Sequence, residues 1–351
     1  MIALRVTSHR VWLLGVELLH AVTTTTVHAQ GHDGKFAELN HAVPSPGSSM
    51  PNWLLNQQEL AIVRRAYARQ MLAIANVRND RLEQAFAAVR REDFLGDEPW
   101  RIARGPALPV NDPVYVYQDV VLALAPERGV NNGSPSLHAK MLNDLAVEPG
   151  QHIAHIGAGA GYYTAMLAEL TGRTGRVTAI EFDSRLAESA RANLASWSNV
   201  TVVCGDGGSA LSESVDGIYV NFGVTAPAAS WIEHLKPNSK LLFPLGVPLP
   251  EVRANFPRYS ARGAAFLIER RTNGFAARWL YPAYYVCAEG SLAGDADTEL
   301  SLYEAFERGG FELVRSMRWN ELSDPTHCWY WTPRWSLSLD ALEGEQNDLR
   351  A

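Results

Sequence analysis

Residues 155–163, His155-Ile156-Gly157-Ala158-Gly159-Ala160-Gly161-Tyr162-Tyr163, place three glycines between an apolar segment and a helical one. Residues 153–156 form a short apolar run typical of a buried strand, and apolar residues at helical spacing follow in residues 162–170. Glycines in such a turn let a ligand approach the backbone, and the helix N-terminus favours negative charge. The stretch therefore predicts a ligand-binding strand, turn and helix, although dinucleotide-binding proteins use a related loop.

The same alternation of short apolar runs and helical patterns continues downstream. Strands are expected at residues 177–181, 200–204, 215–220 and 241–243, and helices at residues 186–194 and 227–235. Repeated strand and helix units predict an α/β fold: a doubly wound, largely parallel Rossmann-like sheet with helices on both faces.

Further elements are predicted on both sides of this sheet. Upstream, helices begin near residues 57 and 80, the second with a capping-box pattern at Asp80 and Glu83, and a loop over residues 106–135 leads into a helix near Leu137. Downstream, Asn273-Gly274 predicts a hairpin between strands at residues 264–269 and 277–281, followed by a helix at 299–308 and a strand at 311–317. The chain thus has an N-terminal helical cover and a C-terminal antiparallel hairpin extension.

These elements suggest four segments. Residues 1–55 form a disordered leader, a signal peptide or an over-extended start; residues 56–150 contain the N-terminal helices and a substrate loop; residues 151–290 form the cofactor-binding domain; and residues 291–351 form a C-terminal extension. In the extension, Trp329-Tyr330-Trp331 and Trp335 are expected to pack against the sheet.

Composition restricts the function classes. The 351 residues are 47% hydrophobic and 20% charged, which is typical of a globular protein, and the net charge of −7 disfavours a nucleic-acid partner. Three widely spaced cysteines support neither a disulfide framework nor a metal site, so we expect reduced, buried thiols. Glu17 and His20 interrupt the only N-terminal apolar run, which favours a cytoplasmic protein over an exported one, and no segment is long enough to span a membrane.

Polar residues follow the second and third predicted strands. Glu181 ends one strand, where a carboxylate can accept hydrogen bonds from both ribose hydroxyls, and Asp206-Gly207 follows the next, where the carboxylate can accept from an exocyclic amine. In an open α/β sheet the carboxyl ends of neighbouring strands form a ligand crevice. Together with the glycine loop, these residues predict a site for a cofactor that contains adenosine.

Several segments resemble the protein-L-isoaspartate O-methyltransferase family over roughly residues 64–287. Residues 88–94 (AVRREDF) resemble the family's VPRExF, residues 155–162 its EIGTGSGY, residues 199–207 its NVxxxxGDG and residues 241–246 (LLFPLG) its LVxPVG. The resemblance implies a class I methyltransferase of protein repair that uses S-adenosylmethionine. It implies cofactor-binding roles for His155, Gly157, Gly159, Gly161, Tyr162, Glu181, Asp206 and Gly207.

Two positions depart from the family pattern. His155 stands where the family has an acidic residue beneath the cofactor, although a neutral imidazole can still make one hydrogen bond. The family's Thr-Ile-Ser-x-Pro segment is Asn131-Asn132-Gly133-Ser134-Pro135 here, which puts Gly133 at the serine position. Either Ser134 or Ser136 takes the serine's place, or both only cap the following helix.

The acceptor is expected to be a carboxylate on a protein or peptide. A carboxylate is ionised at neutral pH and needs no general base, and the sequence contains no evident catalytic His/Asp pair. Asn221, at the end of the fourth strand, is followed by Phe222-Gly223-Val224 rather than by the two prolines of amine-directed methyltransferases. Ser134 and Asn221 are the candidate catalytic residues, and no metal site is expected. The alternatives are a methyltransferase acting on a natural product or ribosomal peptide, and an inactive binding relative.

Overall fold

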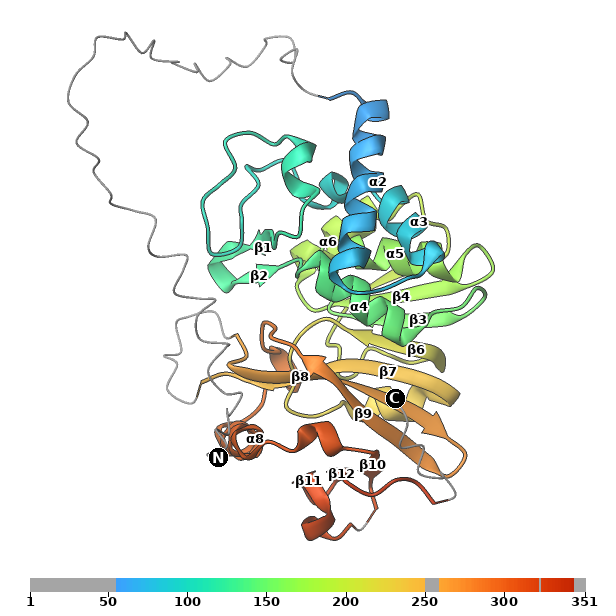
Figure 1. The fold of residues 1–351 in the computed structure, drawn as a ribbon, viewed down its shortest axis with the longest axis vertical. Helices are drawn as coiled ribbons and strands as arrows, with labels where there is room; N and C mark the ends of the chain where they lie inside the picture. The colour runs from blue at the N-terminus through green and yellow to red at the C-terminus, as the bar shows by residue number, and fades with distance from the viewer. Residues whose placement is uncertain (1–54, 250–258, 322, 344–351) are drawn as a thin grey trace, which may run out of the picture. The chain divides into compact units, whose positions relative to one another are not determined.

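A computed structural model describes residues 55–249, 259–321 and 323–343 (Figure 1). Residues 53–351 belong to one compact unit, which therefore contains the predicted N-terminal helices, the cofactor-binding segment and the C-terminal extension. The predicted leader over residues 1–55 lies outside the described residues except for its last one.

A ten-stranded mixed sheet forms the centre of this unit, in the order β11-β12-β10-β9-β8-β7-β6-β3-β4-β5. Its parallel half consists of β3 (His152–Ile156), β4 (Arg176–Glu181), β5 (Val200–Cys204), β6 (Val215–Val220) and β7 (Leu235–Val247). The chain runs outward from β3 to β5 and then returns to β6, on the other side of β3. This reversal confirms the predicted doubly wound α/β fold, and such a reversal is where ligands bind.

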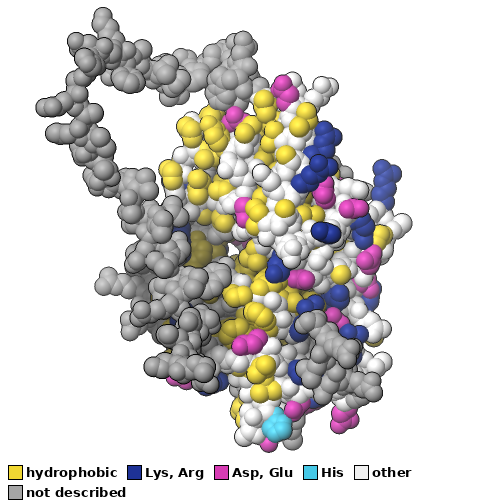
Figure 2. All heavy atoms as spheres, viewed as in Figure 1, with side chains coloured by type: hydrophobic (Ala, Val, Ile, Leu, Met, Phe, Trp, Pro, Cys, Tyr) yellow, Lys and Arg dark blue, Asp and Glu magenta, His cyan; other side chains and the backbone are white. Residues whose placement is uncertain are grey.

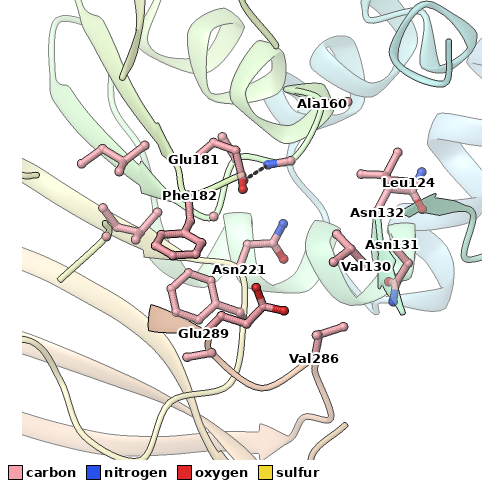
Figure 3. A pocket seen from close by; sticks show the side chains of 18 of the residues that line it. Leu124, Val130, Asn131, Asn132, Ala160, Glu181, Phe182, Asn221, Val286 and Glu289 are labelled. Carbon is pink, nitrogen blue, oxygen red and sulfur yellow. Dashed lines mark hydrogen bonds between the residues drawn. The ribbon is translucent and has the colours of Figure 1, made fainter. Parts of the chain in front are cut away.

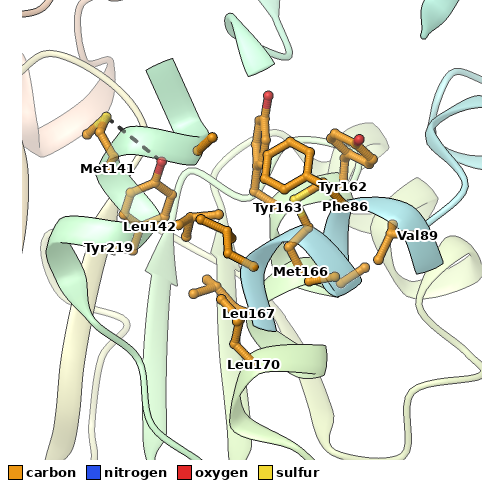
Figure 4. Close-up of a cluster of buried hydrophobic side chains, with 14 of the residues drawn as sticks. Phe86, Val89, Met141, Leu142, Tyr162, Tyr163, Met166, Leu167, Leu170 and Tyr219 are labelled. Carbon is orange, nitrogen blue, oxygen red and sulfur yellow. Dashed lines mark hydrogen bonds between the residues drawn. The ribbon is translucent and has the colours of Figure 1, made fainter. Parts of the chain in front are cut away.

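Helices cover both faces of the parallel half. On one face lie α4 (Pro135–Leu145), α5 (Tyr162–Thr171) and α6 (Ser184–Asn193), and on the other α7 (Ala229–His234) and α8 (Ala296–Arg308). Successive strand residues point to opposite faces, so Ile153 contributes to the first core and Ala154 to the second. Figure 4 shows part of the first core, where Met166 and Leu167 of α5 lie among side chains of the N-terminal helices and α4.

The N-terminal cover consists of two helices, α2 (Gln57–Ile74) and α3 (Asp80–Ala88). α2 begins with a capping box formed by Asn56 and Glu59. The predicted capping box of α3 is wrong, because the cap is Asn79, whose side chain accepts the Leu82 N–H, and Asp80 is already helical. The extended backbone of Asn79 places its amide oxygen over the first turn, so this residue rather than Asp80 caps the helix.

The region predicted as a loop contains an antiparallel hairpin of β1 (Ala123–Ala125) and β2 (Val130–Asn131). A 3-10 turn over Pro126–Arg128 and the left-handed Gly129 (φ 72°) connect the two strands. The loop prediction is wrong here because these short strands have no alternating pattern, and pairing depends on the neighbouring residues 101–103. Further 3-10 turns lie at Arg91–Phe94 and Pro113–Val116.

The C-terminal half of the sheet is antiparallel: β8 (Arg262–Arg271), β9 (Gly274–Pro282), β10 (Ser316–Trp319), β11 (Cys328–Trp331) and β12 (Trp335–Ser338). The hairpin predicted at Asn273-Gly274 joins β8 and β9. The strand predicted at residues 311–317 is wrong in its first half, since Phe311–Leu313 form a 3-10 turn. Trp329, Tyr330 and Trp335 are buried, as predicted, but they belong to strands that were not predicted from the sequence, and Trp331 is exposed.

The described surface mixes acidic and basic side chains, which are interspersed over the face in Figure 2. No helix in the described ranges combines the length and apolar character needed to cross a membrane. No disulfide joins the three cysteines; Cys287 is buried as predicted, whereas the prediction is wrong for Cys204, which is exposed at the sheet edge, and Cys328 is only partly buried.

Candidate functional site

A cavity opens where the carboxyl ends of β3, β4 and β6 meet. The glycine loop, Glu181 and Asn221 line it from the sheet, the β1–β2 hairpin lines it through Leu124 and Val130, and residues 286–289 line it from the C-terminal side. Figure 3 shows Glu181, Asn221 and Glu289 pointing into the same space. The structure thus brings together residues from separate parts of the chain.

The glycine loop holds its shape through bonds to the next strand. The Gly157 N–H donates to the Ile180 carbonyl at 2.9 Å, and the Gly159 N–H donates to Glu181 Oε2 at 2.7 Å. Gly159 has a φ of 57°, a left-handed conformation that glycine adopts without steric cost. The loop is therefore fixed against the same carboxylate that is predicted to bind the cofactor.

Glu181 is buried at the end of β4, with 8% of its surface exposed. Its second oxygen, Oε1, accepts the Asp183 N–H at 2.9 Å. Burial raises the pKa of this carboxyl, and the two backbone donors partly oppose that shift. Each carboxylate oxygen can accept a further hydrogen bond, so the group can still bind two ribose hydroxyls.

Phe182 follows Glu181 and lines the same cavity with half of its surface exposed. This residue was not among those predicted from the sequence, although an apolar residue directly after the strand-end carboxylate was a usable signal. An exposed aromatic ring beside Glu181 offers a flat apolar surface against which an adenine base can pack.

Asp206 lies behind the cavity wall, while its neighbour Gly207 lines the cavity. The Asp206 carboxylate accepts the Ser291 N–H at 3.0 Å, the Ser291 hydroxyl at 2.8 Å and the Gly208 N–H at 2.8 Å. Partial burial alone raises its pKa, but these hydrogen bonds outweigh that effect and lower it. The predicted adenine-binding carboxylate is thus bound to the C-terminal segment, a contact that was not predicted from the sequence.

His155 and Gly161 do not line the cavity. His155 is fully buried in β3, where its Nδ1 pairs with Thr164 Oγ1 at 2.8 Å and its Nε2 has no partner among the described residues. Burial lowers the pKa of this imidazole to about 3, so it is neutral at physiological pH. Gly161 is the N-cap of α5, and its place is set by packing against Leu194.

Tyr162 lines the cavity from the first turn of α5. Its hydroxyl lies 3.3 Å from the hydroxyl of Tyr67 in α2, and its ring packs on Phe94. The structure therefore places this predicted residue at the junction of the cavity wall and the N-terminal cover.

Asn221 presents a free side-chain amide to the cavity. Its backbone N–H donates to the Ile156 carbonyl, which fixes the residue at the end of β6, but its side chain forms no hydrogen bond within the described ranges. By contrast, the amide of Asn131 closes its own turn through bonds to Gly129 and Gly133. Asn221 is therefore a neutral donor available to an acceptor in this cavity.

Ser134 does not line the cavity either. It is the N-cap of α4, accepting the Leu137 N–H, and its hydroxyl donates to Asp119 at 2.9 Å. Ser136 donates to the same carboxylate at 2.5 Å. Ser134 therefore caps the helix, whereas Ser136 lies inside its first turn and contacts Asp119 instead.

Gly133 lies where a side chain cannot be accommodated. It has a φ of 70°, and a Cβ at this position would overlap His138 Nε2 and lie 2.8 Å from His138 Cδ2. The His138 ring is fully buried, stacks on Tyr163 and bonds to the Tyr219 hydroxyl. A packed imidazole ring thus stands where the missing serine side chain would lie.

Arg128, in the β1–β2 connection, is a further residue that was not predicted from the sequence. Its guanidinium forms ion pairs with Asp183, two residues after Glu181, and with Glu289 at 2.5 Å. These contacts, together with the attraction of both carboxylates, raise the pKa of Arg128. The hairpin is thereby fastened to the β4 end and to the C-terminal segment, through long-range contacts that leave no local sequence signal.

No group of three or more His, Cys, Asp and Glu side chains within the described residues is arranged to hold a metal ion. The cavity's polar side chains include a buried carboxylate, a free amide and an ion-paired arginine, set among apolar walls. Such a site can bind and orient a cofactor and an acceptor without a histidine base in its lining.

Comparison with known proteins gives consistent matches. A sequence model of the protein-L-isoaspartate(D-aspartate) O-methyltransferase family matches residues 68–270. A protein-L-isoaspartate O-methyltransferase of Thermotoga maritima is 27% identical over 253 residues, which cover 70% of this chain and 73% of the relative. The Methanopyrus kandleri protein of the same description is 30% identical over 193 residues, covering 53% of this chain and 79% of the relative.

Solved structures share the fold. A protein-L-isoaspartate O-methyltransferase superposes with a TM-score of 0.54 at 24% identity, covering 73% of this chain and 72% of that one. A putative enzyme of the same kind from Plasmodium falciparum, solved in complex with S-adenosyl-L-homocysteine, superposes with a TM-score of 0.50 at 16% identity, covering 64% of this chain and 98% of that one.

Proposed function

The chain belongs to the protein-L-isoaspartate(D-aspartate) O-methyltransferase family, and from this premise we propose that its cavity binds S-adenosylmethionine and an L-isoaspartyl side chain. The reaction is the transfer of a methyl group to the isoaspartyl carboxylate of a protein or peptide. The observation that carries the proposal is the buried Glu181 carboxylate, which is bonded to the glycine loop and faces the cavity at the strand reversal.

The residues around Glu181 fit the cofactor. Glu181 would accept hydrogen bonds from the ribose hydroxyls, Phe182 and Gly207 would hold the adenine, and the backbone at Gly157 and Gly159 would leave space for the rest of the molecule. Bound S-adenosylmethionine supplies an electrophilic methyl group. Asp206 acts from behind Gly207, where its hydrogen bonds to Ser291 fix the C-terminal segment beside the adenine site.

The acceptor side matches a substrate that needs no base. An isoaspartyl carboxylate is already ionised near neutral pH, so the protein has to orient it and exclude water. Asn221 donates a hydrogen bond to one carboxylate oxygen, while Leu124, Val130 and Val286 form apolar walls around it. Glu289 faces the same space, but its ion pair with Arg128 offsets its repulsion of a second carboxylate.

The serine segment has a different role in this proposal from the one that the family pattern implies. Ser134 and Ser136 hold Asp119 at the start of α4, which fixes the loop that carries Asn131. We assign Ser134 to positioning this loop, and we assign the direct contact with the acceptor to Asn221.

The partner is a protein or peptide with an isoaspartyl residue. The net charge of −7 and the mixed surface charges support the exclusion of nucleic acids, and a cytoplasmic location agrees with three cysteines that form no disulfide. Membranes are not expected partners.

The test is methyl transfer from tritiated S-adenosylmethionine to a synthetic isoaspartyl peptide, with the matching aspartyl peptide as the control. We expect base-labile label on the isoaspartyl peptide alone, because a carboxyl methyl ester hydrolyses in mild base. Base-stable label, or equal labelling of the two peptides, would contradict the proposal.

A further inference from the structure

A second cavity lies on the other side of the β1–β2 hairpin. Ala123, Pro126 and Val130 form its apolar floor on the hairpin side, and Leu249 and Ala261 line it from the segments next to β7 and β8. Val130 lines both this cavity and the cofactor cavity. The hairpin therefore stands between the two spaces.

Two arginines stand on the rim of the second cavity, held by a tight turn. The Gly105 N–H donates to the Ile102 carbonyl at 2.8 Å, and the turn is anchored to β1 because the Ala123 N–H donates to the Arg101 carbonyl. Within the turn, Arg104 adopts a φ of 60°, an uncommon conformation for a residue with a side chain. Arg101 and Arg104 are thus both presented next to the hairpin.

The Arg104 guanidinium is further fixed by Tyr259. It lies over the Tyr259 ring, 3.9 Å from the ring centroid, and the Tyr259 hydroxyl donates to the Gly129 carbonyl at the hairpin tip. A guanidinium held over an aromatic ring can still donate its N–H groups to a partner. This contact and the Tyr259 hydrogen bond link the Arg104 side chain to the hairpin.

Within the described residues, no carboxylate compensates the charge of this rim. Arg101 and Arg104 form no ion pair with any carboxylate of residues 55–249, 259–321 and 323–343, although the chain carries seven more acidic than basic residues. Arg128, in the connection of the same hairpin, has two carboxylate partners. The second cavity therefore offers open guanidinium donors above an apolar floor.

We propose that this second cavity binds the polypeptide next to the isoaspartyl residue and selects for an acidic side chain there. The inference rests on the proposed function, since it takes a peptide acceptor as given. An isoaspartyl side chain in the cofactor cavity leaves its own backbone to continue past the hairpin. An extended chain advances roughly 3.3 Å per residue, so the acidic side chain belongs to the residues that flank the isoaspartyl one.

The test is the binding of fluorescein-labelled isoaspartyl peptides to the full chain, measured by anisotropy. Three peptides differ only in carrying Glu, Gln or Lys at the flanking positions. The variants are Arg101→Gln/Arg104→Gln and, as a control that also removes arginine charge, Arg173→Gln in the exposed turn after α5. Thermal unfolding and S-adenosylmethionine affinity verify that each variant is folded.

We expect wild type to bind the Glu peptide about tenfold more tightly than the Lys peptide, as two partly exposed guanidinium contacts would give. This preference disappears in the double variant and persists in Arg173→Gln. Equal affinities in wild type, or a preference that survives in the double variant, overturn the inference.

Methylation of the Gln peptide reports separately on the proposed function. If the binding preference is found but no peptide is methylated, peptide binding by the second cavity stands and the proposed function fails. If the peptides are methylated without any binding preference, the proposed function stands and selective peptide binding by the second cavity is refuted.

Discussion

Replacing Gly133 by alanine or serine is predicted to destabilise the protein without improving activity, even though serine restores the family residue. The glycine has a φ of 70°, and any Cβ at this position overlaps the imidazole of His138. The ring cannot yield easily, because it is fully buried, stacked on Tyr163 and bonded to the Tyr219 hydroxyl.

The size of the effect follows from two contributions. A side chain in a left-handed conformation costs about 1 kcal/mol relative to glycine. Displacing His138 breaks its hydrogen bond to Tyr219, and leaving a buried polar group without a partner costs about 1–3 kcal/mol. We therefore expect Gly133→Ala to lower the free energy of unfolding by about 3 kcal/mol.

Urea unfolding of matched variants separates the two contributions. Gly310 is left-handed (φ 85°, ψ 1°) and has nothing within 4 Å of the place where a Cβ would stand, so Gly310→Ala measures the backbone cost alone. In a His138→Ala background, Gly133→Ala should cost no more than Gly310→Ala does. If Gly133→Ala and Gly310→Ala are equally destabilising in the otherwise unchanged protein, the packing argument is refuted. A gain of isoaspartyl methylation in Gly133→Ser would refute the proposal that Asn221, rather than a serine, contacts the acceptor.

Three further predictions concern the cofactor cavity and pH. Glu181→Gln should weaken S-adenosylmethionine binding about tenfold or more in calorimetry, because hydrogen bonds to a charged acceptor contribute about 1.5–3 kcal/mol. The control, Glu188→Gln on the exposed face of α6, should leave binding unchanged. Arg128→Gln, which releases the hairpin from Asp183 and Glu289, should speed cofactor dissociation in stopped flow by several-fold with little change in melting temperature; an unaltered rate would show that the hairpin does not retain the cofactor. Burial lowers the pKa of His155 to about 3. Between about pH 6.5 and pH 3 this residue therefore carries a proton in the unfolded protein but not in the native one. Acidification over this range should lower the free energy of unfolding by about 1.4 kcal/mol per pH unit through this residue. His155→Gln should remove that contribution relative to wild type in denaturant titrations, and parallel curves would contradict the assignment.

The parts of the fold that could be predicted from the sequence are those with a local cause. The glycine loop lies between β3 and α5 because glycine conformations and apolar periodicity are properties of a short window. Glu181 was identified because a strand-end carboxylate beside such a loop has few other roles. The sequence predicts the ends of helices less well, as at Asn79, where two neighbouring polar residues could each cap the N-terminus of α3.

The parts that could not be predicted depend on contacts between distant residues. The β1–β2 hairpin pairs through residues 101–103, and the β11–β12 pair is held by aromatic side chains that bury against β8 and α8. Arg128 meets Glu289 across 161 positions, and Asp206 meets Ser291 across 85. No periodicity or motif encodes such pairs, so the part of the cavity wall that they hold could not be inferred from the sequence.

The two departures from the family pattern converge on one buried side chain. Tyr219 of β6 shares a hydrogen bond with His138, whose ring occupies the space beside Gly133. The ring of His155 lies 5.3 Å from the same Tyr219 ring, and its Nδ1 is satisfied by Thr164.

Both departures therefore belong to one buried cluster around Tyr219, and neither His138 nor His155 lines the cavity. The groups that face the cavity lie outside this cluster: Glu181 accepts the Gly159 N–H, and Asn221 has a free amide. Glu181 is buried without a cationic partner among the described residues, and a carboxylate in such a place costs stability that a bound ligand can offset. This arrangement supports an active enzyme in which Asn221, rather than the serine segment, contacts the acceptor.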